Sequence, residues 1–165
     1  MVNVNNVIRG FITISCLIIS SGCNNKVSNI SEIKIEFINQ KIKFHKNSKL
    51  YSGQILEYYK SGNLKSEFYT SKGLKNGKFI QYYDNGFKQT YSSFKNGQLD
   101  GEFQSFYQNG SLHINTFYKI NIRHGSYEEF YYNGKIKNCS NFFEGFKIGK
   151  SYEFFESGGT AIYTF

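Results

Sequence analysis

The chain has 165 residues, with 20 Lys and Arg against 12 Asp and Glu, 17 Phe and 14 Tyr, and neither Pro nor Trp. This length fits one domain or a short array of small repeats. The aromatic content excludes an intrinsically disordered chain, because such chains contain few aromatic residues. Three widely spaced Cys exclude a disulfide scaffold and a Cys-based zinc module. The abundance of Phe and Tyr favours β-structure, since aromatic side chains fit a pleated, half-buried surface.

The first 22 residues have the features of an export signal. Arg9 is the only charged residue among the first ten, and a short, mostly apolar run over residues 11–19 precedes the small residues 20–22. This run is too short to span a membrane, which takes about 20 apolar residues. The charged start, apolar centre and small-residue end are typical of a secretory signal.

Cys23 directly follows these small residues. The ending resembles a bacterial lipobox, in which a Cys is acylated and becomes the new N-terminus. Ser20 departs from that pattern, because Leu is usual three places before the Cys. The resemblance implies a lipid anchor at Cys23 in the bacterial cell envelope, since acyl chains bury many methylene groups in a membrane. Two alternatives stay open: a plain secretory signal with an incidental Cys, and a buried N-terminal strand.

Two segments lie between this Cys and the rest of the chain. Residues 23–32 are polar and are expected to form a tether. In residues 33–49, apolar residues at 33, 35 and 37, and again at 42 and 44, alternate with charged residues. This alternation predicts two strands joined near 39–40, a non-repeat cap for the first edge of a repeat array. Six Lys against two Glu in residues 24–49 fit either solvated edge lysines or contact with anionic headgroups.

The remaining residues, 50–165, follow a 24-residue repeat. Three series of Gly recur at this interval: Gly53, Gly77, Gly101, Gly125 and Gly149, then Gly62, Gly86, Gly110, Gly134 and Gly158, then Gly73, Gly97 and Gly145. Asn121 takes the missing place in the third series, and Asn tolerates a left-handed backbone conformation next best to Gly. Internal repetition at such a period decides the fold.

Aromatic pairs fall in register with the Gly series. The pairs are Tyr58-Tyr59, Tyr82-Tyr83, Phe106-Tyr107, Phe130-Tyr131 and Phe154-Phe155. Three Gly of the second series follow Asn, and Asn-Gly predicts a tight hairpin because both residues tolerate positive φ. Each repeat therefore reads as strand, tight turn, strand and looser turn. Imperfect alternation in the first strand indicates a bulge or a strand with two contacting faces.

A helical alternative is disfavoured, because each Gly in a helix interior costs about 1 kcal/mol. We predict an all-β fold, an elongated antiparallel β-meander built from tandem 24-residue hairpin repeats. About ten short strands would form a single-layer ribbon with four full repeats and a truncated fifth.

This arrangement of Gly, paired aromatics, Asn-Gly, a further aromatic and a closing Gly resembles the variant MORN repeat. More narrowly, it resembles the YwqK family of toxin–antitoxin antitoxins. The resemblance covers Tyr51 to Phe165, with three departures: the absence of Trp, Asn121 in place of Gly, and a shortened last unit. It implies a non-catalytic binding module and brings no catalytic residues with it.

Residues with catalytic or metal-binding chemistry are few. The three histidines, His45, His113 and His124, lack metal-ligand spacing. The carboxylates at one repeat position, Glu57, Glu129 and Glu153, with Glu128 beside them, could mimic a glycosidase pair, but equivalent positions on an open ribbon predict a solvated polar face. Cys139 is expected to be a small, half-buried strand residue. We expect no catalytic residue, metal or cofactor.

The exposed aromatic columns suit protein recognition, because Tyr gives a large contact area at low entropic cost. We expect a protein partner at the bacterial envelope, antitoxin-like or immunity-like, that contacts the paired aromatics. These residues are Tyr58, Tyr59, Tyr82, Tyr83, Phe106, Tyr107, Phe130 and Tyr131.

Other partners stay open. The aromatic and basic faces could instead bind envelope glycan or anionic lipid, and hydrolysis of envelope polymers is a third alternative. No nucleic acid partner is expected, because the Lys residues form no single repeat column among the aromatics. The apolar end at residues 163–165 indicates edge-to-edge pairing of two copies.

Overall fold

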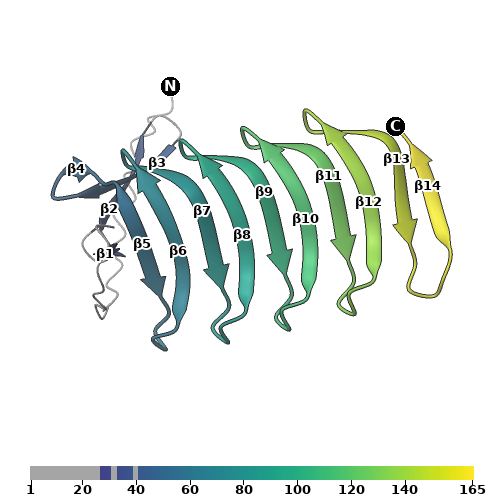
Figure 1. Cartoon of the computed structure of the whole chain (residues 1–165), viewed down its shortest axis with the longest axis horizontal. Helices are drawn as coiled ribbons and strands as arrows, with labels where there is room; N and C mark the ends of the chain where they lie inside the picture. Colours follow the sequence, from purple (N-terminus) through teal and green to yellow (C-terminus); the bar gives the residue numbers. More distant parts are fainter. Residues whose placement is uncertain (1–26, 31–32, 39–40) are drawn as a thin grey trace, which may run out of the picture.

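The computed structural model describes residues 27–30, 33–38 and 41–165, and most of these residues are in β-strands. The strands form two sheets (Figure 1). The expected export signal at 1–22, the expected acylation site Cys23 and the first residues of the expected tether lie outside the described residues. No helix within the described ranges is long and apolar enough to cross a membrane.

The larger sheet is a meander in chain order, in which each strand from β5 to β14 pairs antiparallel with the next. The strands are β5 (Gly53–Tyr58), β6 (Leu64–Ser71), β7 (Leu74–Tyr82), β8 (Lys88–Lys95), β9 (Gln98–Phe106), β10 (Leu112–Lys119), β11 (Ile122–Phe130), β12 (Ile136–Phe143), β13 (Phe146–Phe154) and β14 (Thr160–Thr164). The sheet stays open along its length (Figure 1). The predicted all-β meander of hairpin repeats is confirmed.

The smaller sheet lies at the β5 end and contains β2 (Ile33–Ile38), β3 (Lys41–Lys46) and β4 (Lys49–Leu50). Strands β2 and β3 form where the alternating pattern predicts them, and Phe44 of β3 packs its ring 5.2 Å from the ring of Phe68 in the first repeat. Ile33, Tyr51 and Ile55 complete this buried cluster. The backbone N–H of Phe44 also donates to a carbonyl of the turn after β6, at Gly73. The smaller sheet therefore covers the apolar start of the array.

Part of the segment expected to be a tether is a strand. Residues Val27–Asn29 form β1, which pairs parallel with β5 on the side that faces away from β6. Ser28 is buried, and the ammonium group of Lys46 donates to its hydroxyl over 3.0 Å. The polar composition that suggests a tether also allows this pairing, because edge pairing uses backbone groups rather than apolar side chains.

One row of directly paired side chains runs across the array and forms its interior. We call it the central row: Ile55, Phe68, Phe79, Ser92, Phe103, Thr116, Tyr127 and Ser140. Beyond the first repeat, aromatic residues on the first strand of each hairpin alternate with Ser or Thr on the second. These small residues are almost fully buried, with 3% of Ser92 and none of Thr116 exposed. The hydroxyl of Thr116 donates to the carbonyl of Ser126 over 2.9 Å, so its burial leaves no unpaired polar group.

The two kinds of turn differ from the expectation. The tight two-residue turns lie at the third Gly series, where both residues have positive φ: Lys72-Gly73, Asn96-Gly97, Ile120-Asn121 and Glu144-Gly145. This is the signature of type I′ turns, whose twist matches that of the flanking strands. The prediction that the Asn-Gly dipeptides of the second Gly series form the tight turns is wrong, although Asn96-Gly97 of the third series does form one.

The turns at the second Gly series, three of which are Asn-Gly, are three-residue loops in which only this Gly has positive φ. In the first repeat, the N–H of Gly62 donates to Tyr59, and the N–H of Tyr59 donates to Asn63. This pattern is a type I turn closed by a left-handed Gly. Asn is favoured before the Gly because its side-chain oxygen accepts the backbone N–H two residues later, over 3.1 Å for Asn85 and 3.0 Å for Asn109.

The Gly of the first series lie inside strands rather than before them. Gly101 has φ of 116° within β9, and the pairing of β8 with β9 shifts register around it. A Cβ atom there would stand 2.9 Å from the Cβ of Ser93. The Gly therefore permits a bulge at this point of β9. The bulge that the imperfect alternation suggests lies nearer the end of the first strand, where the register shifts between Glu57 and Tyr58.

Ile120 offers a test of the turn assignment. It is a β-branched residue with φ of 52°, and 53% of it is exposed, so its side chain gains little burial there. Ile120→Asn should raise the free energy of unfolding by about 1 kcal/mol, because the left-handed conformation strains Ile and suits Asn. Urea denaturation would measure the change. Ile122→Asn is the control, equally exposed but in a strand, and a gain of the same size there would contradict the turn assignment.

Candidate functional site

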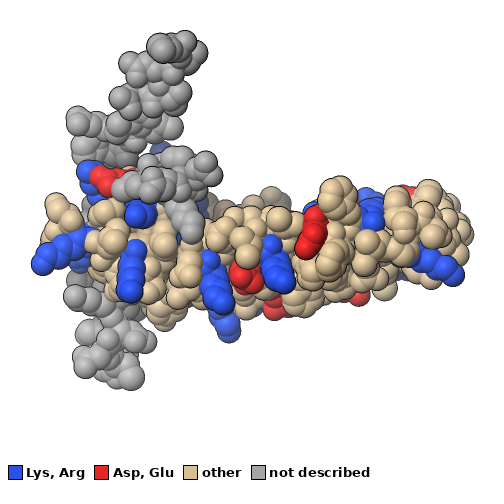
Figure 2. All heavy atoms as spheres, turned by 90° about the horizontal axis from the view of Figure 1, so that it is seen from above, with Lys and Arg blue, Asp and Glu red and all other residues tan. Residues whose placement is uncertain are grey.

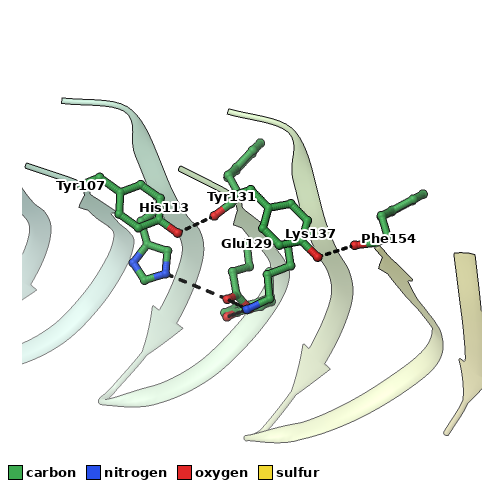
Figure 3. Close-up of polar contacts among 8 residues, drawn as sticks. Tyr107, His113, Glu129, Tyr131, Lys137 and Phe154 are labelled. Carbon is green, nitrogen blue, oxygen red and sulfur yellow. Dashed lines mark hydrogen bonds and ion pairs between the residues drawn. The ribbon is translucent and has the colours of Figure 1, made fainter. Parts of the chain in front are cut away.

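The second aromatic of each pair joins neighbouring repeats. The Tyr131 hydroxyl donates to the backbone carbonyl of Phe154 over 2.8 Å, and the Tyr107 hydroxyl donates to Phe130 over 2.9 Å (Figure 3). Tyr59 and Tyr83 make the equivalent bonds to Tyr82 and Phe106. The donor and acceptor are always 23 residues apart. We call this contact the tyrosine joint. The hydroxyls of all four Tyr are thus committed to the repeat interface.

A second set of contacts lies at the opposite ends of the strands. In each type I′ turn, the N–H of the second residue donates to a carbonyl at or just before the start of the first strand of the same repeat, 22 residues earlier. The pairs are Gly73 to Tyr51, Gly97 to Lys75, Asn121 to Leu99 and Gly145 to Arg123, at 2.8 to 2.9 Å. Asn121 adds a side-chain contact, because its Oδ1 accepts the N–H of Leu99 over 2.7 Å. This explains how Asn substitutes for Gly at this position.

The first aromatic of each pair ends its strand. Tyr58, Tyr82, Phe106 and Phe130 are all half-buried. The hydroxyl of Tyr82 donates to Glu67 over 2.7 Å, and burial together with this carboxylate raises the pKa of Tyr82 to about 12. The backbone carbonyls of Tyr82, Phe106 and Phe130, and that of Phe154 in the last pair, receive the tyrosine joints. Whether a partner contacts the aromatic columns stays a prediction, but any such contact would use ring faces and edges rather than the joint hydroxyls.

Two of the acidic residues that share a repeat position, Glu57 and Glu129, are paired with cations, whereas Glu153 accepts from the Tyr163 hydroxyl over 3.4 Å. Glu129 accepts from Lys137 over 2.7 Å and from the Tyr127 hydroxyl over 3.2 Å, and His113 lies 4.0 Å away (Figure 3). The hydrogen bond to Glu129 raises the pKa of Lys137. Glu57 accepts from Lys65 over 2.8 Å in the first repeat. Glu57 and Glu129 are therefore held in ion pairs on the sheet surface.

The three histidines and Cys139 lie apart. His45 is near Glu36, His113 is near Glu129, and the His124 ring packs 5.2 Å from that of Phe143. Among the described residues, no three His, Cys, Asp or Glu side chains are placed to hold a metal ion. Cys139 is half-buried in β12, as predicted, and burial raises the pKa of its thiol. A raised thiol pKa disfavours the reactive thiolate at neutral pH.

Cations cover the aromatic rings near the type I′ turns. The Lys75 ammonium lies 3.9, 4.9 and 5.1 Å from the ring centres of Phe79, Phe68 and Phe94. Two repeats later, Arg123 stacks in the same way over Tyr127 and Phe142. Sequence reasoning missed this feature, although Lys75 and Arg123 share a repeat position. Burial lowers the pKa of Lys75 to about 8, while the facing rings favour its charged form.

A row on the other face of the sheet differs in every repeat. We call it the variable row: Leu56, Glu67, Ile80, Tyr91, Gln104, Asn115, Glu128, Cys139, Tyr152 and Ile162. Each strand from β5 to β14 contributes one residue to this row, and all of these residues except the exposed Ile162 are half-buried. In the middle of the row, Asn115 donates to Glu128 over 3.0 Å, and Gln104 lies 3.4 Å from Asn115. The row carries no repeat signature, so sequence reasoning missed it.

The tyrosine joint can be tested by removing one hydroxyl. Tyr131→Phe should lower the free energy of unfolding by about 1 kcal/mol, because it deletes one hydrogen bond and leaves the Phe154 carbonyl without its side-chain partner. Tyr132→Phe is the control, because the adjacent Tyr132 is 59% exposed. Urea denaturation would compare the two variants. Equal effects at 131 and 132 would contradict a structural role for the joint.

The half-buried Lys75 predicts a pH-dependent stability. Its folded pKa lies below the unfolded value of 10.5, so the charged form is penalised in the folded state and the penalty disappears between pH 8 and pH 10.5. Lys75→Met should therefore stabilise the protein at pH 7 by about 2 kcal/mol and lose this advantage by pH 10.5. Lys78→Met, exposed on the same strand, is the control. Denaturation at a series of pH values would check this, and a constant difference between wild type and Lys75→Met would refute it.

The comparison with protein families agrees with this geometry. A family model described as a MORN repeat variant matches residues 51–72, 99–119 and 123–143. The three segments correspond to the hairpins β5–β6, β9–β10 and β11–β12. No curated protein matches the chain. The hairpin β7–β8 shares the same turns and tyrosine joint. Residues 51–143 therefore contain repeats that are similar to the MORN variant in three segments and that share one repeated geometry.

Proposed function

We propose that the protein is a non-catalytic repeat scaffold that binds a protein partner at the bacterial envelope through the variable row. The observation that carries this proposal is a division between repeat positions. Residues that recur every 24 positions are used internally, as turns, bulges and tyrosine joints. The variable row makes none of these recurring contacts and lies on an open sheet face. Repeat proteins offer such extended surfaces to their partners.

The chemistry of the variable row fits a protein partner. Tyr91 and Tyr152 supply aromatic area on either side of a polar centre, and aromatic residues are enriched at protein interfaces. The amides of Gln104 and Asn115 supply donors and acceptors between them. Ten strands at about 4.8 Å spacing give this row a length of about 45 Å, enough for a standard interface.

The location and the biological role rest on the sequence. Acylation of Cys23 would hold the array at a membrane, with the described residues presented to the envelope. The resemblance to the YwqK family supports an antitoxin or immunity role within this proposal. A toxin that acts in the envelope would be accessible to an exported scaffold, whereas a cytoplasmic toxin would not.

A second candidate, binding to an anionic lipid surface, is favoured by the distribution of charge. Residues 33–100 contain twelve Lys and Arg against five Asp and Glu, whereas residues 101–165 contain six of each. Lys and Arg stand out over the smaller sheet and the first repeats (Figure 2). A basic segment close to an anionic membrane gains about 1 kcal/mol for each charge.

A pull-down would test the proposed function. The full chain, tagged at its C-terminus, is expressed in bacteria, and the bait is recovered from solubilised membranes and analysed by mass spectrometry. We expect one near-stoichiometric protein partner. Combined Tyr91→Ser and Tyr152→Ser substitutions should reduce its recovery at least tenfold, because central aromatic residues dominate interface energies. Tyr132→Ser is the matched control on a turn. Cys23→Ser should release the bait from the membrane fraction.

The alternative outcomes separate the candidates. A partner that is lost with Tyr132→Ser but kept with the paired variant would refute the variable row as its site. If the bait carries no protein partner and its Cys23→Ser variant still stays in the membrane fraction, binding to anionic lipid is favoured over binding to a protein. Circular dichroism of the variants would establish that each one is folded before binding is compared.

A further inference from the structure

The last strand of the array has an open edge. Strand β14 pairs only with β13 among the described residues, whereas the β5 side of the sheet is covered by β1. The edge contains Thr160, Ala161, Ile162, Tyr163 and Thr164, with neither a charged residue nor Pro. Ile162 is 58% exposed. Natural proteins usually protect such an edge with charges, Pro or a bulge.

The hydrogen bonds to β13 identify the backbone groups at this edge. Gly149 and Phe165 exchange two backbone hydrogen bonds, at 3.1 and 2.9 Å. Bonded and non-bonded pairs alternate along an antiparallel ladder. The N–H and C=O groups of Thr160, Ile162 and Thr164 therefore point away from β13. They are ready to pair with another strand.

The tyrosine joint disfavours the docking of another repeat of the same kind at this edge. Tyr59, Tyr83, Tyr107 and Tyr131 each donate a hydroxyl to the following repeat. At the equivalent position of the last hairpin stands Phe155, which has no hydroxyl. A further repeat docked here would lack the contact that joins all the others.

Head-to-tail stacking of two arrays is also disfavoured. It would place β14 of one copy against β5 of the next, but β1 pairs with that side of β5 through residues 54–56. A symmetric contact meets no such obstacle, because both copies offer the same open strand. With antiparallel pairing about Ile162, the facing residues are Ile162 with itself, Tyr163 with Ala161 and Thr164 with Thr160. No like charges meet in this arrangement.

We propose that two copies of the chain associate through β14, which pairs antiparallel with itself across a twofold axis and joins the two arrays into one continuous sheet. The contact is small, so we expect a weak dimer in solution. A shared membrane surface would raise the effective concentration of the copies. The dimer would place two variable rows end to end on one face.

Light scattering during size-exclusion chromatography would test this proposal. The purified full chain, kept in mild detergent, is measured from about 1 to about 300 µM, the range expected for small interfaces. We expect the protein mass to double within this range. Ile162→Pro removes only an outward N–H, which edge strands tolerate, and Ile162→Lys places two cations against each other. Both should raise the dissociation constant at least tenfold.

Ile122→Lys is the control, since Ile122 is 48% exposed but lies on β11, away from the edge. It should dimerise like the wild type. Thermal unfolding of all variants establishes that they are folded. A wild-type chain that stays monomeric over the whole range would overturn the proposal. So would variants at Ile162 that dimerise unchanged, or a wild-type monomer whose β14 instead captures an extended segment of another protein.

Discussion

The hydrogen bond from a Tyr hydroxyl to a carbonyl 23 residues later is the contact on which this architecture depends. A single two-stranded hairpin is marginally stable in water, so each repeat needs its neighbours. The tyrosine joint fixes one end of neighbouring hairpins, and the type I′ turn amides fix the other end. With both ends fixed, the strands stay in one register. The central row and the variable row then run unbroken across the sheet.

A single-layer sheet has no second layer to cover its apolar residues, and this chain compensates in two ways. Ser and Thr at Ser92, Thr116 and Ser140 leave room for the aromatic rings of the neighbouring strands to pack in the central row. Near the type I′ turns, Lys75 and Arg123 lie over the rings and shield them from water. Their alkyl stems supply apolar contact, while the charge is stabilised by the rings.

In this sheet, the residues that hold the repeats together differ from the residues that are available to recognise a partner. The residues that recur in every repeat make contacts within the sheet, so they are the same along the array and cannot distinguish one partner from another. The positions that differ between repeats give each part of the sheet its own surface. The variable row changes along the sheet from Ile80 and Tyr91 through polar Gln104 and Asn115 to Tyr152. In a scaffold of this kind, specificity belongs to these residues.

The sequence by itself determined the repeat length, the meander and the strands β2 and β3 of the smaller sheet, because Gly spacing and apolar alternation are local signals. The sequence also located the turns, but it predicted the tight turn where the three-residue loop lies and the looser turn where the type I′ turn lies. Asn-Gly favours a type I′ turn locally and forms one at Asn96-Gly97. In the second Gly series, however, the Asn side chain closes a longer loop, while Lys72, Ile120 and Glu144 accept positive φ. That choice reflects the pairing of whole strands rather than dipeptide preference.

Only the tertiary structure decided how the candidate site is built. The Tyr columns are visible in the sequence, but the carbonyls that receive their hydroxyls are not, because any residue offers a carbonyl. The same holds for β1, which pairs through its backbone despite a polar sequence. The cations over the rings and the variable row depend on which residues face each other across strands. Bulges shift that register, so it cannot be counted along the chain.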